Sequence, residues 1–320
     1  MFGKVLTIAG NAFRETVRQP VFCLVLGVAA AMIALSPTFT MFTLMESVKL
    51  VQDIGLSTIL LAGLVLAVLS ASTVVSEEVR GRTAQMVVSR PVGRGEFVVG
   101  KFLGLLVAQA VVCYLLSLVL VLTVRVGVKD AAYTKIDSAV IWAQVGAVVL
   151  TLAVAAAVNY FFDKPFPSAV VFTALVTFTL VFLAFGFVDR DLHRVPYLSA
   201  MNLQTLVACA VLFPMVAILT AAAVACATRL SLVTSVVTCS LFFAVGMVSD
   251  FFFGKSGGGF ALRLAYRVLP NFQVFWMGDA LAAEKAVPGA YAGTALAYGA
   301  LYTTALVCLG MALFERREIA

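Results

Sequence analysis

The sequence predicts an all-α polytopic membrane protein, and its composition and hydropathy pattern carry that prediction. Of the 320 residues, 62% are hydrophobic and 12% are charged, and the mean hydropathy is +1.07. An average globular protein has about 25% charged residues. Several apolar runs reach the roughly 20 residues needed to cross about 30 Å of hydrocarbon. We therefore expect residues 1–320 to form a single transmembrane domain.

Residues 1–20 predict an amphipathic helix that lies in the membrane interface and leads into the first span. Arg14 and Arg18 stand where a secretion signal would have its apolar core, and no small-x-small cleavage site follows, so a cleaved signal is not expected. One helical face carries the apolar side chains Phe2, Val5, Leu6, Ala9, Phe13 and Val17.

Eight spans are predicted after this helix. They lie at about 21–42, 54–75, 97–124, 139–161, 168–188, 205–227, 232–252 and 290–312. The gaps between the fourth and seventh spans are short and contain Lys164, Arg194 and Arg229, so the spans on either side should be antiparallel neighbours.

The placement of Lys and Arg residues favours a cytoplasmic N-terminus and a cytoplasmic C-terminus. The cytoplasmic set then includes Arg80, Arg82, Arg90 and Arg94, between the second and third spans, and Lys101, near the start of the third. The net charge of +6 is therefore interpreted as juxtamembrane charge rather than a nucleic-acid footprint.

Residues 76–104 hold the densest run of charge, and residues 76–91 of this stretch form the loop between the second and third spans. Glu77 and Glu78 would occupy the first turn of a short helix, where the helix dipole favours negative charge. Val79, Thr83, Met86 and Val87 would form its apolar face, and Pro91 would stop it. The alternatives are a short helix across the membrane surface and an ordinary solvated loop.

The order of residues in this loop resembles the membrane subunit of type-2 ATP-binding cassette (ABC) transporters, the ABC-2 exporter permeases. The matching residues are Glu77, Gly81, Thr83, Ser89, Pro91, Arg94, Gly100 and Lys101. Arg82 separates Gly81 from Thr83, which departs from the Gly-Thr step of that family.

The resemblance implies a permease subunit that is not itself an enzyme. It implies two copies of the chain, as a homodimer or as a heterodimer with a related permease, in a bacterial inner membrane. Each copy would dock on a separate ABC ATP-binding subunit that carries ATP and Mg²⁺. The expected coupling residues are Glu77, Glu78, Gly81, Thr83, Met86, Val87, Pro91 and Arg94.

Two other classes of function are weighed against this one. A membrane scaffold or assembly factor of the same fold would move no substrate. An intramembrane enzyme would need paired carboxylates, a His cluster or a G-x-S-x-G elbow, and the sequence has none.

His193 is the only histidine and is expected in a loop, and the six cysteines, all in apolar runs, are expected to act as small hydrophobes. No catalytic, cofactor or metal site is predicted.

Gly95–Lys101 fits the pattern G-x-x-x-x-G-K, but Phe102 stands where a hydroxyl should hold Mg²⁺ and no strand precedes it. Gly100 and Gly104 instead predict a small-xxx-small face for close helix packing.

Apart from Lys101 and Asp250 near span ends, the spans hold no acidic or basic residue by these boundaries, which argues against coupling to an ion gradient. The strongest polar groups are Gln109, Gln144 and Asn159, together with serines and threonines at 57, 58, 70, 72, 151, 177 and 235. They would either line a translocation path or form hydrogen bonds between helices worth about 0.6 kcal/mol each. The apolar spans favour a lipid or amphiphile over a small ion as substrate.

Residues 253–289 form the longest external segment. Phe260–Leu269 is amphipathic, and the family resemblance implies short external helices before the last span. Two interpretations stay open: an outer gate, or an interfacial anchor with Trp276 and Tyr291 as aromatic-belt residues.

Overall fold

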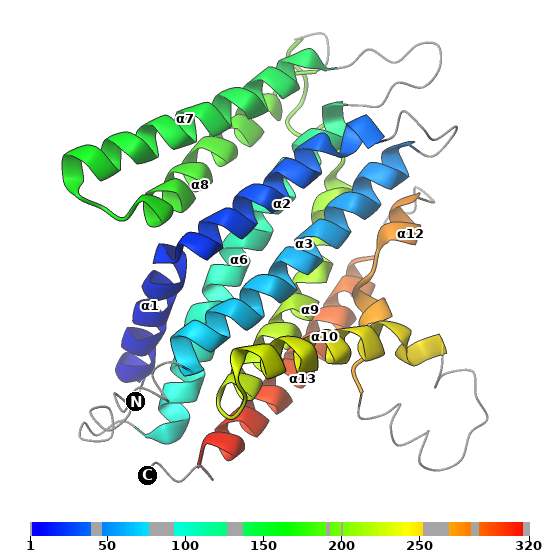
Figure 1. The fold of residues 1–320 in the computed structure, drawn as a ribbon. Helices are drawn as coiled ribbons and strands as arrows, with labels where there is room; N and C mark the ends of the chain where they lie inside the picture. The colour runs from blue at the N-terminus through cyan, green and yellow to red at the C-terminus, as the bar shows by residue number, and fades with distance from the viewer. Residues whose placement is uncertain are drawn as a thin grey trace.

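The computed structural model describes residues 2–39, 47–76, 93–126, 137–189, 193–199, 201–251, 269–282 and 288–315. Within these ranges the chain is almost entirely helical (Figure 1). Eight helices are long and apolar enough to cross a membrane, as predicted. They are α2 (Pro20–Phe39), α3 (Ser47–Ala71), α6 (Arg94–Val126), α7 (Ser138–Phe162), α8 (Phe166–Phe185), α9 (Leu203–Ala227), α10 (Leu232–Ser249) and α13 (Gly289–Glu315).

The largest error in the predicted boundaries is at the second span. Helix α3 begins at Ser47, seven residues before the predicted start, and a short π-helix, η2 (Ser72–Ser76), continues it. The early turns carry Lys49, Gln52 and Asp53, so hydropathy alone excluded these turns from the predicted span. Gln52 is buried, and its side-chain amide donates to the Thr205 hydroxyl at 3.0 Å. The polar turns are therefore part of the helix because the protein itself supplies a hydrogen-bond acceptor.

Helix α9 is the centre of the bundle. It packs against α13, α3, α6 and α10, and almost its whole length is buried. Small residues allow this close packing. A methyl group on Gly63 of α3 would lie 2.9 Å from Val216, and one on Gly310 of α13 would lie 3.4 Å from Ala225.

Helices α7 and α8 form an antiparallel hairpin at the side of the bundle (Figure 1), as the short gap at Lys164 predicted. The Thr151 and Thr177 hydroxyls join the two helices at 2.7 Å. Asp163 closes the turn in the left-handed conformation, with φ of 51°. Among the spans, the hairpin contacts α6 and α2.

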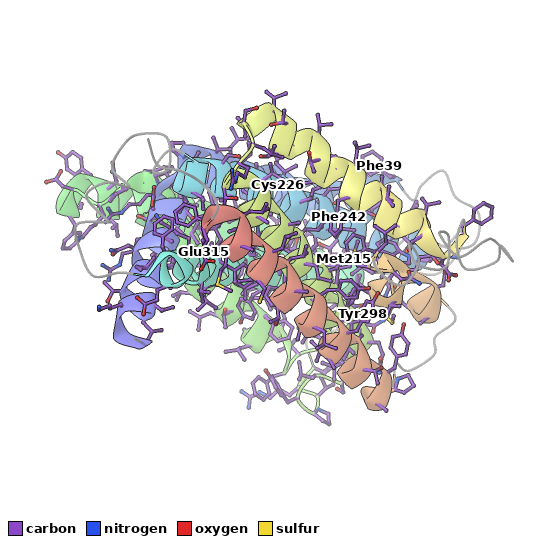
Figure 2. The ribbon with its side chains drawn as sticks, turned by 90° about the horizontal axis from the view of Figure 1, so that it is seen from below. Phe39, Met215, Cys226, Phe242, Tyr298 and Glu315 are labelled. Atoms are coloured by element: carbon purple, nitrogen blue, oxygen red, sulfur yellow. The ribbon has the colours of Figure 1, made fainter. Side chains whose placement is uncertain are left out.

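The start of α1 (Phe2–Arg18) and the end of α13 lie at the same end of the molecule (Figure 1). Figure 2 shows Cys226 and Glu315, near the ends of α9 and α13, towards one end, with Phe39 and Tyr298 towards the other. With eight candidate spans the two termini would lie on one side of the membrane, and the cytoplasmic location of that side stays a prediction.

Candidate functional site

The predicted coupling residues Glu77, Glu78, Gly81, Thr83, Met86, Val87 and Pro91 lie outside the described residues. Arg94 is the first residue of α6. The structure does describe the two attachment points of this loop, at the end of η2 and at the start of α6, and both are in contact with other helices.

The first attachment point, η2, is a π-helix, a conformation that is often found at functional sites. Thr73 accepts a hydrogen bond from the Gln19 side chain at 2.7 Å and donates to the carbonyls of Leu69 and Ser70. Val74 and Val75 are buried against the bundle. The end of the second span is thereby joined to the segment between α1 and α2.

The second attachment point is the first turn of α6, which contacts the end of α13. The Glu96 carboxylate accepts a hydrogen bond from the Gly93 backbone N–H at 3.1 Å and adds negative charge where the helix dipole favours it. The Phe97 ring stacks on Phe314, with the ring centroids 5.6 Å apart. The start of the third span and the end of the last span therefore form one packed unit.

Gly100 and Gly104 make the predicted close helix contact, and the helix they contact is α1. A methyl group on Gly100 would lie 2.7 Å from the Ile8 side chain. One on Gly104 would lie 2.5 Å from the Ala9 carbonyl oxygen and 2.6 Å from Ala12 Cβ. The small-xxx-small prediction is confirmed.

Lys101 lies between the two glycines and is buried, although it is only in the second turn of α6. Its Nζ lies 3.4 Å from the Glu15 carboxylate of α1 and 5.7 Å from the centre of the Phe97 ring. Gly95–Lys101 is thus a helical segment whose lysine pairs within the chain, which is not the geometry of a phosphate-binding loop. The expectation that the spans hold no charge in their interiors is therefore wrong for α6. Lys101 is a buried charge in this helix, and Glu15 of α1 supplies its counter-charge.

Helix α1 forms where the sequence predicts it and buries Ala12 and Val17, while Leu6, Arg14 and Arg18 stay exposed. Its location in a membrane interface stays a prediction.

Two of the three strongest polar groups within the spans, Gln109 and Gln144, make hydrogen bonds between helices. The Gln109 amide donates to the Gly63 carbonyl at 3.1 Å, and Gln144 donates to the Thr123 hydroxyl at 3.3 Å. Asn159 donates to the Lys164 carbonyl and closes the α7–α8 turn. For Gln109 and Gln144, the structure therefore shows the second of the two expected roles, hydrogen bonding between helices.

At the opposite end of the bundle lies an ion pair that the sequence analysis missed. Arg125 Nε donates to the Asp137 carboxylate at 3.1 Å, and both side chains are 2% exposed. Arg125 also donates to the Phe185 carbonyl, and Asp137 accepts from the Val140 N–H at 3.2 Å. An aspartate directly before an apolar run is an N-cap signal, so the start of α7 could have been found from sequence, but not its partner.

Two short helices precede the last span: η4 (Phe272–Phe275) and α12 (Gly278–Ala282). Their external location stays a prediction. Of the amphipathic run at 260–269, only Leu269 lies within the described residues. Phe272 and Phe275 are fully buried in the core.

Hydrogen bonds join this segment to α13. The Asn271 backbone N–H donates to the Tyr298 hydroxyl, and the Tyr291 hydroxyl donates to the Val274 carbonyl, each at 2.8 Å. The segment therefore enters the bundle between α10 and α13 instead of only resting on its surface.

His193 is exposed in the short segment between α8 and α9, as predicted. The six cysteines are free, and the described ranges contain no group of three or more side chains suited to hold a metal ion.

A comparison with protein families matches residues 24–230 to the family described as ABC-2 family transporter protein. A search of the curated proteins gave no match. The matched range covers more than half of the chain and includes α3, α6, α7, α8 and α9 as well as the loop at 76–91. The chain is an integral membrane protein with eight candidate spans, and it belongs to the ABC-2 family of transporter membrane proteins.

Proposed function

We propose that this chain is the permease subunit of an ATP-driven exporter. Family membership implies a partner that binds ATP. In the proposal, two copies of the chain form the membrane core, as a homodimer or with a related permease, in a bacterial inner membrane. Each copy docks on one ABC ATP-binding subunit, where ATP and Mg²⁺ stay. The substrate passes between the two copies.

The observation that carries the proposal is the way in which the loop at 76–91 is attached. On one side of the loop, η2 is bonded to Gln19. On the other side, α6 is packed on α1 through Gly100 and Gly104 and on α13 through Phe97. Both ends of the loop therefore lead into packed helices, so a displacement of the loop would be transmitted to the spans.

The loop supplies the chemistry expected of a docking surface. Glu77, Glu78 and Arg94 provide charge, and Met86 and Val87 provide apolar contact. Gly81 and Thr83 lie between these groups, and Pro91 ends the proposed helix. These residues would couple two subunits and would not take part in chemistry.

The test is to replace Met86 or Glu77 by alanine in the assembled complex. Co-purification of the ATP-binding subunit and ATP hydrolysis should both fall, because an interface anchor contributes more than about 1 kcal/mol when truncated. Leu150→Ala is the control, since Leu150 is exposed on α7 and is not part of the loop.

If ATP hydrolysis and co-purification both survive in the Met86 and Glu77 variants, the docking surface is wrongly placed. Transport into sealed vesicles that contain the complex separates the two classes of function, a permease subunit and a membrane scaffold. A complex that hydrolyses ATP but moves no amphiphile would favour the scaffold alternative.

A further inference from the structure

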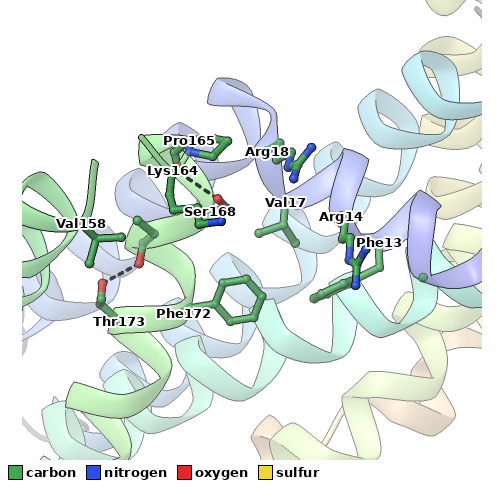
Figure 3. Close-up of a pocket in the computed structure, with 12 residues that line it drawn as sticks. Phe13, Arg14, Val17, Arg18, Val158, Lys164, Pro165, Ser168, Phe172 and Thr173 are labelled. Atoms are coloured by element: carbon green, nitrogen blue, oxygen red, sulfur yellow. Dashed lines mark hydrogen bonds between the residues drawn. The ribbon is translucent and has the colours of Figure 1, made fainter. Parts of the chain in front are cut away.

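A cavity of about 650 Å³ lies between α1 and the tip of the α7–α8 hairpin (Figure 3). Twelve residues line it: Gly10, Phe13, Arg14, Val17, Arg18, Val158, Lys164, Pro165, Ser168, Ala169, Phe172 and Thr173. Its size is within the range of pockets that hold small organic ligands. The candidate coupling surface does not use it, and the hydrogen bonds of the spans do not explain it.

The polar part of the lining is positively charged. Arg14 and Arg18 come from α1, and Lys164 comes from the hairpin turn on the other side of the cavity (Figure 3). The twelve lining residues, all of them described, include no Asp or Glu.

The nearest carboxylates in sequence, Glu15 and Asp163, do not line the cavity. Glu15 is paired with Lys101 on α6, and Asp163 is exposed and closes the end of α7. Among the described residues, none of the three cations forms an ion pair. The cavity therefore keeps an excess of positive charge and favours an anion.

The start of α8 adds to this preference for an anion. Pro165 is the N-cap of α8 and makes no side-chain capping hydrogen bond. Pro165 and Ser168 both line the cavity, so the positive end of a 20-residue helix is at its wall. Backbone N–H groups at such a helix end bind phosphate and carboxylate groups. Pro165 and Pro167 have no N–H, so the donors at this end are limited to residues such as Phe166 and Ser168.

The rest of the lining is apolar. The Phe13 and Phe172 rings lie edge to face with their centroids 6.4 Å apart, and Val17 and Val158 complete the apolar side. The Ser168 and Thr173 hydroxyls already donate to backbone carbonyls at 2.8 Å and 2.7 Å. A ligand that fits this lining has an anionic head and an apolar body.

The position of the cavity points to the membrane as the source of that ligand. The cavity lies where α1 approaches the first span and where two other candidate spans turn. Tyr160, Phe161 and Phe162, at the end of α7, are 80%, 73% and 68% exposed, as is typical of aromatic side chains at the membrane interface. Phospholipid headgroups occupy this level of a bilayer.

From this combination we infer that the cavity binds the phosphate headgroup of an anionic membrane phospholipid. Arg14, Arg18 and Lys164 bind the headgroup together with the first turn of α8. The acyl chains lie along Phe13, Val17 and Phe172. The inference does not depend on the direction of transport or on the ATP-binding partner.

The test uses the purified full-length chain in detergent and measures bound lipid by native mass spectrometry. The probes are phosphatidylglycerol, which is anionic, and phosphatidylcholine, which is zwitterionic. The pocket variant is Arg14→Gln with Lys164→Gln, one change on each side of the cavity. The control variant is Lys4→Gln with Arg194→Gln, which removes the same charge from two residues that do not line the cavity.

The natural chain should retain phosphatidylglycerol over phosphatidylcholine, and the pocket variant should lose roughly 10- to 30-fold in phosphatidylglycerol affinity, since each cation near the headgroup contributes about 1 kcal/mol. The control variant should keep its preference. Elution volume and the melting temperature of each variant show whether it is folded.

Two results would overturn the inference: equal retention of the two lipids by the natural chain, or equal loss in the pocket and control variants. The third arm adds inorganic phosphate at millimolar concentration. If phosphate alone displaces the lipid as well as soluble phosphatidylglycerol does, the cavity is a site for a free phosphate compound and the lipid assignment is wrong.

Discussion

Gly104 of α6 allows close helix packing because the backbone of α1 lies directly against it. The backbone of α1 at Ala9 and Phe13 approaches so closely that even a methyl group would overlap it. Gly27, on the exposed side of α2, has nothing within 4 Å of the place where a methyl group would stand. The two glycines are both inside helices, so they form a matched pair that separates packing from helix propensity.

We predict that Gly104→Ala destabilises the protein by about 1–3 kcal/mol, the usual cost of overpacking, because α1 must move away from α6. Gly27→Ala should be neutral or should stabilise by about 0.5–1 kcal/mol, since alanine is the better helix former. Thermal unfolding in detergent measures both. An unchanged melting temperature for Gly104→Ala would show that α1 does not pack against α6 in this way.

Asp137 combines two tasks at the start of α7. It caps the helix and it compensates the buried charge of Arg125. Breaking a buried pair by removing one partner costs far more than losing a surface pair, because the remaining charge stays desolvated.

Asp137→Asn keeps the capping oxygen and removes only the charge, so its effect reports on the ion pair. We expect a loss of about 3–5 kcal/mol in the free energy of unfolding. The control is Asp163→Asn, an exposed position in the left-handed conformation that asparagine tolerates, where the expected change is within about 0.5 kcal/mol. Equal melting temperatures for the two variants would contradict the buried pair.

At the scale of an element, the segment from Asn271 to Ala282 is held by its aromatic side chains. Phe272 packs edge to face on Phe242 at 5.7 Å and close to Gly246, where there is no room for a side chain. Phe275 packs beside Tyr298 at 5.9 Å. A connecting segment with two fully buried phenylalanines belongs to the core of the protein.

Phe272→Ala is predicted to cost about 3–5 kcal/mol of unfolding free energy, because it leaves a cavity between α10 and the following segment. Phe162→Ala serves as the control, since Phe162 is 68% exposed at the end of α7. The loss should be large in the first variant and small in the second when both are measured by thermal unfolding. Similar melting temperatures would show that the segment does not enter the bundle.

The sequence predicted the elements well where length and hydropathy decide, and poorly where tertiary contacts decide. All eight spans and the helix before them could be found because about 20 apolar residues have few alternatives in a membrane. The early start of α3 could not, because Gln52 is tolerated there only through Thr205, 153 residues away in sequence. For the same reason the glycines at 100 and 104 predicted a close contact but not that α1 makes it.

Of the candidate site, the sequence identified the loop, and the structure adds what its two ends contact. The Gln19–Thr73 hydrogen bond and the Phe97–Phe314 stack join parts of the chain that no local pattern relates. Such pairs depend on the fold as a whole, so periodicity and spacing contain no signal for them.

At the scale of the whole molecule, the eight crossings separate two sets of helix ends. Gly3 in α1 and Gly289 at the start of α13 belong to opposite sets, and a side chain at either position has nothing within 4 Å. They are therefore suitable positions for probes of orientation.

We predict that in a chain without its six natural cysteines, Gly289→Cys reacts with a membrane-impermeant maleimide in intact cells. Gly3→Cys should react only after the cells are permeabilised, because the Lys and Arg distribution favours a cytoplasmic N-terminus. Reaction of Gly3→Cys in intact cells would reverse the proposed orientation and place the loop at 76–91 outside.

The enclosure of α9 by its own chain has a consequence for substrate choice. A second copy of the subunit can reach α2, α10 and α13, which are largely uncovered, but it cannot reach a helix that is already surrounded. Side chains of the outer helices would therefore meet a molecule that moves between the copies. Substitutions in α9 should alter how much protein folds and leave the selection of cargo unchanged.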